Sequence, residues 1–350
     1  MPNQLIRPAT PPALSETDEA ALTDLYVRGT PKNTLRAYER DLIYITAWKQ
    51  ALLKQSLTWP ETEETALRFV LDHSRDLSGA DPQDPARVAA RALIAAGLRK
   101  SLACPAPATL DRRIASWRAF HRMKNLASPF EAPLIRQARA KARRAAARPA
   151  APKSANPITR EVLEAMLATC NQSLRGIRDR AILMLGWASG GRRRSEIAAL
   201  MRADVSLKDY ANDGLVWLSM VETKTTGKGA TPRLVLKGRA AQALAFWIET
   251  ALIEDGPLFR PVTVNDDPLE RALSPDGIYQ IVQKRLEAAG YPAGFATPHG
   301  LRSGFLTQAA LDGAPIQAAM RLSLHRSLAQ AQKYYDDVEI ADNPAADLLG

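Results

Sequence analysis

The sequence has few of the residues that build disulfide frameworks or metal centres. Its 350 residues include two cysteines and four histidines. Cys104 and Cys170 lie far apart, and neither belongs to the cysteine and histidine spacing of a zinc site. We therefore expect two free thiols in a reducing compartment. No acidic cluster suggests a bound metal, so neither a metal nor another cofactor is expected.

Signals for membranes and export are also missing. No stretch approaches the roughly 20 consecutive apolar residues of a membrane-spanning helix, and the longest apolar run, Ala181 to Ala188, is far shorter. The N-terminus has no basic segment followed by an apolar one, which excludes a secretory signal peptide. We expect a soluble, cytoplasmic protein without a membrane partner.

Positive charge, in contrast, is abundant. Lysine and arginine outnumber aspartate and glutamate by 47 to 37, which gives a formal net charge of +10. A basic surface favours nucleic acid or an anionic membrane face as the partner, although net charge carries no information about the fold. The length is enough for about two domains.

Apolar spacing and proline placement predict four segments. Residues 1–13 are expected to be disordered. Residues 14–147 are expected to form four or five short helices, because apolar residues recur every three to four positions, as from Leu35 to Trp48. Residues 148–157 are predicted to be a basic linker, and residues 158–350 a second domain.

The second domain is predicted to be mostly helical with one small antiparallel β-sheet. Leu215–Val221 and Arg233–Leu236 have strand-like composition and flank a polar Gly-Lys-Gly turn. Helical patterns surround this hairpin on both sides. The predicted fold class is therefore mainly α, with a helical N-terminal domain and a mostly helical C-terminal domain.

A basic run joins the two predicted domains. From Arg136 to Arg160 there are eight lysines and arginines and no acidic residue. Phosphate contacts would explain this run, because affinity for nucleic acid scales with the number of phosphates neutralised. A solvated linker with no role in binding is the alternative.

Two of the histidines lie among basic residues. Thr297-Pro298 predicts a helix start, so His299 and Arg302, three residues apart, share one face near the helix N-terminus. The helix dipole there favours an anion, and the pair would suit a phosphate. His325 follows later, and Tyr334 comes nine residues after it.

Three consecutive arginines, Arg192 to Arg194, come directly after Gly190-Gly191. Adjacent side chains point in different directions, so at most two of the three can reach one site. Glu196, one turn further on, is well placed to hold one of them. A solvated basic turn is the alternative interpretation.

Taken in order, these motifs resemble the tyrosine recombinase (phage integrase) family, from about Ser15 to Tyr335. GGRRRSEIAAL resembles the first arginine box, TKTTGKG the lysine of a β-hairpin, HGLR the second box and LHRS the next. PKNTLRAYERDLIYITAW resembles the first helix of the core-binding domain, which would make residues 14–147 that DNA-binding domain and 158–350 the catalytic domain with a C-terminal tail. The implied catalytic residues are Arg193, Glu196, Lys224, His299, Arg302, His325 and Tyr334. Lys228 and Tyr335 are the rivals of Lys224 and Tyr334.

Two features depart from the family pattern. Arg192 and Arg194 stand where apolar residues are common, and Leu324 replaces the glycine usually seen before the second histidine. None of the six chemical positions is lost.

The resemblance implies a site-specific recombinase that cuts and rejoins DNA by chemistry like that of type IB topoisomerases. Tyr334 would form a 3′-phosphotyrosine, Arg193 and Arg302 would hold the phosphate oxygens, and Lys224 would protonate the leaving 5′-oxygen. His299 would act as the base and His325 as a further hydrogen-bond donor. No metal or ATP is needed. Integration, excision and resolution of DNA elements all use these same residues.

The resemblance also implies double-stranded DNA as the partner, a C-shaped clamp, and a homotetramer on two sites at the nucleoid. Each subunit would pass residues 336–350 to a neighbour, unless they form a frayed tail. The chain is expected to start directly at the core-binding domain. The DNA contacts proposed from charge and position are Arg36, Arg40, Arg112, Arg113, Arg118, Arg143, Arg144 and Arg148.

Three alternatives remain at this point. A DNA-binding protein with the same fold that does not cut would lack a catalytic position. A relative that relaxes supercoils or seals hairpin telomeres would use the same residues. A metal-dependent nuclease would require clustered acidic and histidine ligands.

Overall fold

The computed structural model describes residues 15–147, 153–220, 232–325 and 327–341. The chain divides into two compact units, Met1–Ala150 and Ala151–Gly350. The predicted disordered residues 1–13, Arg148, and both candidate lysines Lys224 and Lys228 lie outside the described residues. None of the described helices is long and apolar enough to cross a membrane.

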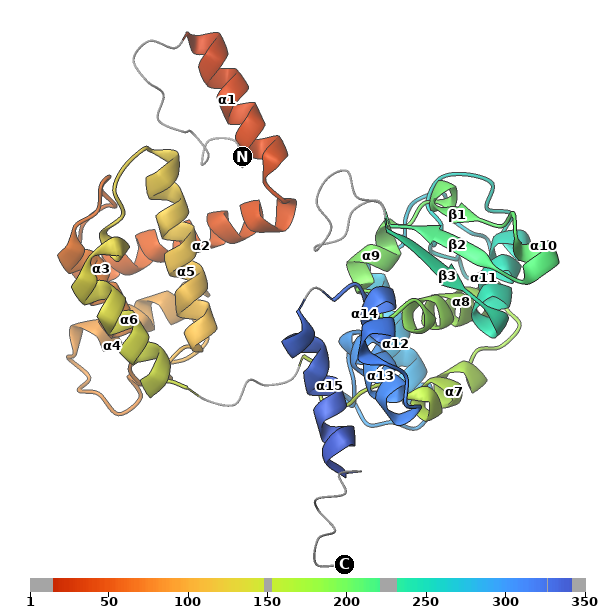
Figure 1. Ribbon diagram of the computed structural model, residues 1–350. Coiled ribbons are helices and arrows are strands. Elements are labelled where there is room, and N and C mark those ends of the chain that lie inside the picture. Colours follow the sequence, from red (N-terminus) through yellow and green to blue (C-terminus); the bar gives the residue numbers. More distant parts are fainter. Residues whose placement is uncertain (1–14, 148–152, 221–231, 326, 342–350) are drawn as a thin grey trace, which may run out of the picture. The chain divides into compact units, whose positions relative to one another are not determined.

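The N-terminal unit is helical throughout its described residues (Figure 1). Its elements are α1 (Glu16–Gly29), α2 (Lys32–Leu53), α3 (Glu63–Asp72), α4 (Pro85–Ala95), α5 (Pro107–Met123), the short 3-10 helix η2 (Pro129–Glu131) and α6 (Pro133–Ala145). Side chains fix several helix starts. The hydroxyl of Ser15 accepts the N–H of Asp18, whose carboxylate accepts the N–H of Ser15 in return. The side chains of Thr62 and Asp84 likewise accept backbone N–H groups in the first turns of α3 and α4, without a bond in return.

Aromatic residues form the core of this unit. Trp48 of α2 meets Phe69 of α3 edge-to-face at 4.9 Å between ring centroids, and Phe69 meets Trp117 of α5 at 5.3 Å. Such edge-on contacts match the charge distribution of aromatic rings. The predicted apolar stripe of α2 is therefore buried at its C-terminal end, where Ile45 and Trp48 lie.

Both histidines of this unit belong to the core. The Nδ1 of His73 donates to the carbonyl of Phe69 at 2.7 Å, which leaves its Nε2 to accept from the hydroxyl of Tyr44 at 2.8 Å. Burial lowers the pKa of His73 to about 3, so the ring is neutral. His121 likewise lies within hydrogen-bonding distance of the carbonyl of Trp117 and the N–H of Glu61.

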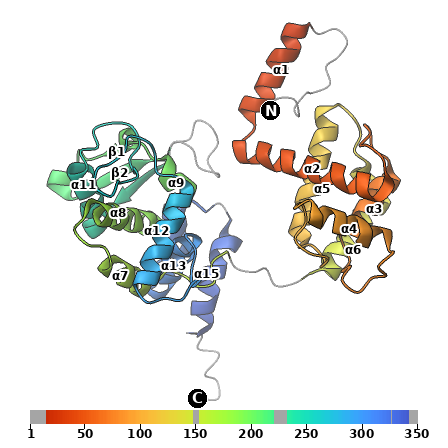
Figure 2. The same cartoon turned by 180° about the vertical axis from the view of Figure 1, so that it is seen from behind.

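The C-terminal unit contains helices around one small sheet. Its elements are α7 (Arg160–Ala168), α8 (Leu174–Ala188), α9 (Arg194–Ala199), η3 (Arg202–Asp204), β1 (Val205–Ser206), α10 (Tyr210–Asp213), β2 (Val216–Ser219), β3 (Arg233–Leu236), α11 (Gly238–Thr250), α12 (Pro275–Ala288), α13 (His299–Leu311), α14 (Ile316–Ser323) and α15 (Leu328–Ala341). Helix α8 runs between the sheet with α11 on one side and α7 with α13 on the other (Figures 1 and 2).

The predicted hairpin is confirmed as an antiparallel pair, with Val216 opposite Leu236 and Leu218 opposite Leu234. A third strand that the sequence analysis did not predict, β1, pairs with β2 on its other edge. Two residues are too few to give an alternating pattern. The mainly helical fold class with a small antiparallel sheet is confirmed.

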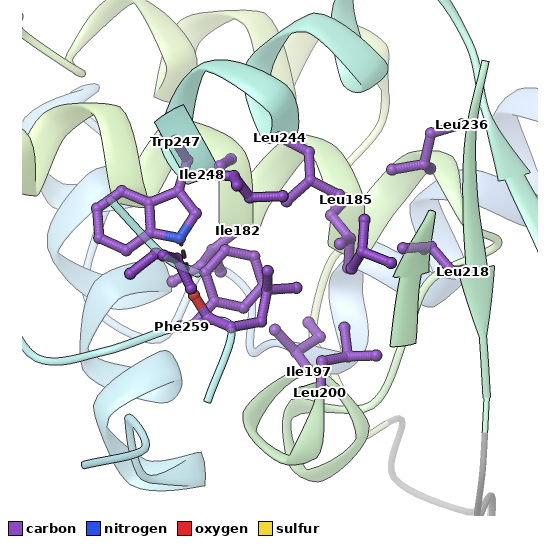
Figure 3. Packing of buried hydrophobic residues seen from close by; sticks show 14 of the residues in the cluster. Ile182, Leu185, Ile197, Leu200, Leu218, Leu236, Leu244, Trp247, Ile248 and Phe259 are labelled. Atoms are coloured by element: carbon purple, nitrogen blue, oxygen red, sulfur yellow. Dashed lines mark hydrogen bonds between the residues drawn. The ribbon is translucent and has the colours of Figure 1, made fainter. Parts of the chain in front are cut away.

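The sheet and α11 close over α8 to form the core of this unit (Figure 3). Ile182 and Leu185 of α8 face Leu244 and Trp247 of α11, and the indole N–H of Trp247 donates to the carbonyl of Leu258 at 2.9 Å. This packing anchors the C-terminal end of α8, from which the first arginine box continues.

Two glycines then bring that box against α13 and α14. Gly190 and Gly191 have φ values of +92° and +72°, a conformation that residues with a Cβ rarely adopt. A Cβ on Gly190 would lie 2.4 Å from the carbonyl carbon of Leu322, and one on Gly191 would lie 2.1 Å from the Cα of Arg302. The glycine pair therefore permits a close approach that larger residues would prevent.

Candidate active site

The first arginine box presents Arg193 at the start of α9. One carboxylate oxygen of the buried Glu196 accepts the backbone N–H of Arg193 at 3.1 Å, and the other pairs with its guanidinium. About a third of the Arg193 side chain, 33%, stays exposed. Glu196 thus fixes both the backbone and the side chain of an arginine that can still reach a ligand, as the sequence analysis predicted.

Helix α13 presents His299 and Arg302. The helix begins at His299, one residue later than predicted, with Pro298 directly before it. The hydroxyl of Thr297 accepts the N–H of His299. Arg302 is only 4% exposed. Its Nη1 donates to the carbonyl of Gly191 at 3.2 Å and its Nε to the Nε2 of His325 at 3.2 Å.

His325 follows the C-terminal end of α14. Because its Nε2 accepts from Arg302, its Nδ1 carries the proton and donates to the hydroxyl of Ser323 at 2.8 Å. Leu324, between them, has φ 54° and ψ 39°, in the left-handed region. The glycine that this chain lacks at position 324 would adopt that backbone without strain.

Helix α15 carries the two candidate tyrosines. The Tyr334 hydroxyl lies 3.4 Å from the Nε2 of His299, within hydrogen-bonding distance. Tyr335 is only 5% exposed, and its hydroxyl donates to the carbonyl of Ala314 at 3.1 Å. Of the two tyrosines, Tyr334 is therefore the one placed beside the predicted base.

A cavity of about 410 Å³ opens over these basic residues. Its lining residues are Lys153, Gly191, Arg192, Arg193, Arg194, Tyr279, Thr297, Pro298, His299 and Arg302. Neither Lys153, which lies in the basic run from Arg136 to Arg160, nor Tyr279 is among the predicted site residues. The carbonyl of Lys153 accepts the hydroxyl of Thr297, a contact between residues 144 positions apart that local pattern could not reveal.

Burial and positive charge act together on the ionisable groups here. The pKa of His299 falls to about 4, first because of burial and then because of the cations of Lys153, Arg302 and Arg193. That of His325 also falls to about 4, with burial again the largest cause. Burial lowers the pKa of Arg302 to about 10, so it keeps its charge at neutral pH. Burial raises the pKa of Tyr334.

Such a site combines neutral imidazoles with charged guanidiniums at a cavity lined by basic residues. Neutral His299 can accept a proton, and the arginines can hold the oxygens of an oxyanion. Within the described residues, no group of three histidine, cysteine, aspartate or glutamate side chains is arranged to hold a metal ion.

The comparison with protein families identifies this unit. Residues 156–339, which include Arg193, His299, Arg302, His325 and Tyr334, match the model of the phage integrase family. The chain belongs to this family.

Curated relatives of this phage integrase family chain include recombinases. It is 30% identical to the integrase/recombinase xerD homolog of Selenomonas ruminantium over 175 residues. The aligned part covers 48% of this chain and 50% of the relative. It is 32% identical over 188 residues to the tyrosine recombinase XerD of Xanthomonas axonopodis pv. citri, covering 51% and 57%. The chain thus spans about half the length of the curated relatives it matches.

Solved structures show the same fold at low sequence identity. The Tn1549 transposon integrase in complex with transposon right end DNA gives a TM-score of 0.56 at 14% identity, over 93% of this chain and 98% of that chain. The XerH site-specific recombinase bound to palindromic difH substrate gives 0.52 at 15% identity, over 96% and 85%.

In the N-terminal unit of this family member, the predicted DNA contacts differ in environment. Arg36, Arg40 and Arg144 are exposed. The other described ones pair with carboxylates: Arg112 with Asp41, Arg118 with Glu131 and Arg143 with Asp111.

Arg113 is the exception. It is buried, and its guanidinium lies 3.2 Å from the ring centroid of Tyr44. One residue along a helix turns the side chain by about 100°, so Arg113 faces the core while Arg112 faces outward. A core position is thus found where we predicted a DNA contact, and this part of the prediction needs correction.

Proposed function

We propose that this chain is a site-specific DNA recombinase that cuts and rejoins strands through a 3′-phosphotyrosine on Tyr334. One observation carries the proposal: the Tyr334 hydroxyl stands 3.4 Å from the Nε2 of His299, which lines the same cavity as Arg193 and Arg302. A phosphodiester in the cavity would meet the base His299 and a cationic clamp, and the attacking oxygen of Tyr334 stands next to that base. Family membership and the recombinase names of the relatives support this reading.

The arginines would stabilise the charge of the transition state. The pentacovalent state concentrates negative charge on the non-bridging phosphate oxygens. Arg193 and Arg302 would each place N–H donors on these oxygens, and a half-buried site makes such bonds stronger than in water. Glu196 would hold Arg193 in place without entering the reaction.

The proton of Tyr334 would pass to His299. Attack then forms the bond from phosphorus to the tyrosine oxygen and breaks the bond from phosphorus to the 5′-oxygen. The leaving 5′-oxygen needs a proton, which we assign to Lys224, with Lys228 as its rival. The phosphoryl bond is conserved in the phosphotyrosine, so the reverse attack by a 5′-hydroxyl rejoins the strand without ATP.

His325 would change partners when DNA binds. In the described site its Nε2 accepts from Arg302. A phosphate oxygen that takes up the Nε–H of Arg302 would free this nitrogen, and its negative charge would raise the low pKa of the ring. Once protonated, His325 could donate a further hydrogen bond to the phosphate.

Exchange between two duplexes breaks four strands, and each break uses one tyrosine. We therefore propose a homotetramer on two DNA sites, acting at the nucleoid in the cytoplasm. Among the predicted contacts of the N-terminal unit, the exposed Arg36, Arg40 and Arg144 are the strongest candidates for phosphate binding, because Arg112, Arg118 and Arg143 pair with carboxylates and Arg113 is buried. Exchange of residues 336–350 between protomers stays a prediction, since residues 342–350 lie outside the described ones.

The test uses a nicked duplex, from which the fragment beyond the cut dissociates and traps the adduct. The duplex would carry a sequence selected for binding from a random library. Full-length protein is incubated in EDTA, and a denaturing gel detects the covalent complex. We expect an adduct with the wild type and with Tyr335→Phe and none with Tyr334→Phe. Loss with Tyr335→Phe instead would move the nucleophile by one residue, and tight binding without any adduct would favour a non-cutting DNA-binding protein.

A further inference from the structure

Arg192 is the most deeply buried arginine of the basic triplet. It is 1% exposed, whereas Arg193 and Arg194 keep 33% and 46% of their side chains exposed. An arginine here is unexpected, because this is the position at which the sequence analysis anticipated an apolar residue. Burial lowers its pKa to about 10, so it still carries its charge at neutral pH. A buried cation is costly unless it is paired and hydrogen-bonded, so the partners of Arg192 show whether it has a structural role.

The partners of Arg192 indicate such a role. Its Nη2 donates to the carbonyl of Leu322 at 2.8 Å, and its Nη1 lies 3.8 Å from the Oε2 of Glu196. Leu322 is in the last turn of α14, where carbonyls have no partner within the helix. Arg192 supplies that partner from another element, and a cation at a helix C-terminus also opposes the helix dipole.

This contact closes a ring of interactions around the site. From Arg192 the ring passes to Leu322 and along the chain to Ser323, whose hydroxyl bonds to the Nδ1 of His325. The Nε2 of His325 bonds to Arg302, which donates to the carbonyl of Gly191, the neighbour of Arg192. The ring therefore connects the segment before α9, helix α13 and the end of α14, where Arg193, Arg302 and His325 lie or follow directly.

The turn that presents His325 depends on such support. Leu324 occupies a left-handed conformation that a leucine adopts only with strain. The surrounding structure must hold the residues on both sides of a strained position. On the N-terminal side, the contact of Arg192 with Leu322 meets this need, and an apolar residue at position 192 could not.

We propose that Arg192 is a positioning residue that fixes His325 by holding the last turn of α14, so that the imidazole stands beside Arg302 and the phosphate. Arg192 lies in the wall of the cavity but is almost fully buried, and it acts through Leu322 and Ser323. This inference rests on the proposed recombinase function. It goes beyond the family chemistry because it assigns a role to a residue that departs from the family pattern.

The experiment compares Arg192→Met and Arg192→Lys with the wild type on the nicked duplex described above. We expect Arg192→Met to lower the rate of adduct formation by about 10²-fold, the effect of a displacement near 1 Å at a reacting centre. The duplex concentration for half-saturation should change little, because the buried guanidinium of Arg192 is bonded to Leu322 within the protein. Arg192→Lys keeps the cation but not the forked donor, and its rate should lie between the two.

Arg260→Met is the matched control. Arg260 also donates to backbone carbonyls, those of Pro257 and Asp255, and it lies outside the site. We expect this variant to form the adduct at the wild-type rate. Wild-type rates for both Arg192→Met and Arg192→Lys would overturn the inference and leave the recombinase function standing. If Arg192→Met fails to fold, Arg192→Lys decides alone, and a wild-type rate for it overturns the inference.

A second readout does not depend on cleavage. In the free protein, burial is the largest cause of the low pKa of His325, and the charges of Arg302, Arg193 and Arg192 lower it further, with a smaller contribution from His299. Nuclear magnetic resonance of the His325 ring in Arg192→Met should show a higher pKa and a shifted ring resonance. An unchanged ring would overturn the inference even if the wild type formed no adduct, whereas a missing wild-type adduct alone counts only against the proposed function.

Discussion

The two units each contain two histidines whose pKa lies below the ordinary value, mainly because of burial, but the units use them differently. In the N-terminal unit, the ring nitrogens of His73 bond to Tyr44 and to a backbone carbonyl in a closed core. In the C-terminal unit, His299 and His325 are half-buried and contact Tyr334 and Arg302. A lowered pKa therefore does not mark a reactive histidine by itself; access to an incoming anion does.

The arginines show the same contrast. In the N-terminal unit, Arg112, Arg118 and Arg143 each pair with a carboxylate of another element. At the candidate site, Glu196 is shared by Arg192 and Arg193, while Arg302 bonds to a carbonyl and to a neutral imidazole. Positive charge is thus paired with carboxylates at these three positions of the N-terminal unit and left in excess at the candidate site, as a phosphate site requires.

The largest expected effect comes from replacing one histidine in each unit. His299→Gln removes the proposed base, and we expect adduct formation on the nicked duplex to slow by about 10²–10⁴-fold, the usual contribution of general base catalysis. His121→Gln perturbs the core of the other unit and should lower stability but leave the rate per folded molecule unchanged. The gel assay, normalised to the folded fraction, measures both.

Equal losses of rate in the two variants would contradict the distinction between a core histidine and a site histidine. A wild-type rate for His299→Gln, with Tyr334→Phe inactive, would instead assign the proton of Tyr334 to another acceptor.

Much of this contrast could be predicted from the sequence, where local spacing decides the structure. The pairing of Arg193 with Glu196 depends on three residues of one helix start, and the β-hairpin on alternating residues close in sequence. The choice between Tyr334 and Tyr335 rested on the nine-residue spacing from His325, and the structure places Tyr334 beside His299.

Where the environment comes from distant segments, the sequence was less informative. Charge alone marked Arg113 as a DNA contact, although helix geometry turns it toward Tyr44. Lys153 reaches the cavity through a contact with Thr297, and Arg192 gains its partner from α14. These positions depend on packing between elements, which composition and periodicity do not encode.

The acid stability of the two units offers a finer test. His73 has a folded pKa of about 3 against an ordinary 6.5, so the unfolded chain binds a proton that the folded unit does not. The contribution of neutral His73 to the free energy of unfolding is fully present above pH 6.5. It is lost progressively as pH falls from 6.5 to about 3, at about 1.4 kcal/mol per pH unit. Hydrogen exchange of core amides in the N-terminal unit should follow this slope. His73→Gln, which can keep the bond to Tyr44, should reduce this dependence of stability on pH.

Bound DNA should change the protonation of the site histidines and leave that of the core histidines unchanged. A phosphate near His299 and His325 raises their pKa, so duplex binding takes up protons and strengthens as pH falls between the bound pKa and the free value of about 4. Resonances of His73 and His121 should titrate identically with and without the duplex. Affinity that is independent of pH across this window would place the phosphate away from both site histidines.

The smallest expected effect is on stability, and it concerns the left-handed backbone conformation, which non-glycine residues adopt in both units. Asn125 in the N-terminal unit has φ 52°, and Leu324 before His325 has φ 54°. Asparagine tolerates this left-handed conformation, whereas leucine is strained there by roughly 1–2 kcal/mol. Leu324 offsets part of this cost by packing against the core of its unit.

Leu324→Asn loses that packing but relieves strain, while Leu324→Ala loses the packing and keeps the strain. Chemical denaturation should therefore show Leu324→Asn to be the more stable of the two by about 0.5–1 kcal/mol. Equal stabilities would mean that the turn presenting His325 carries no strain, and that its geometry is set by the contacts of Leu322 and Ser323 alone.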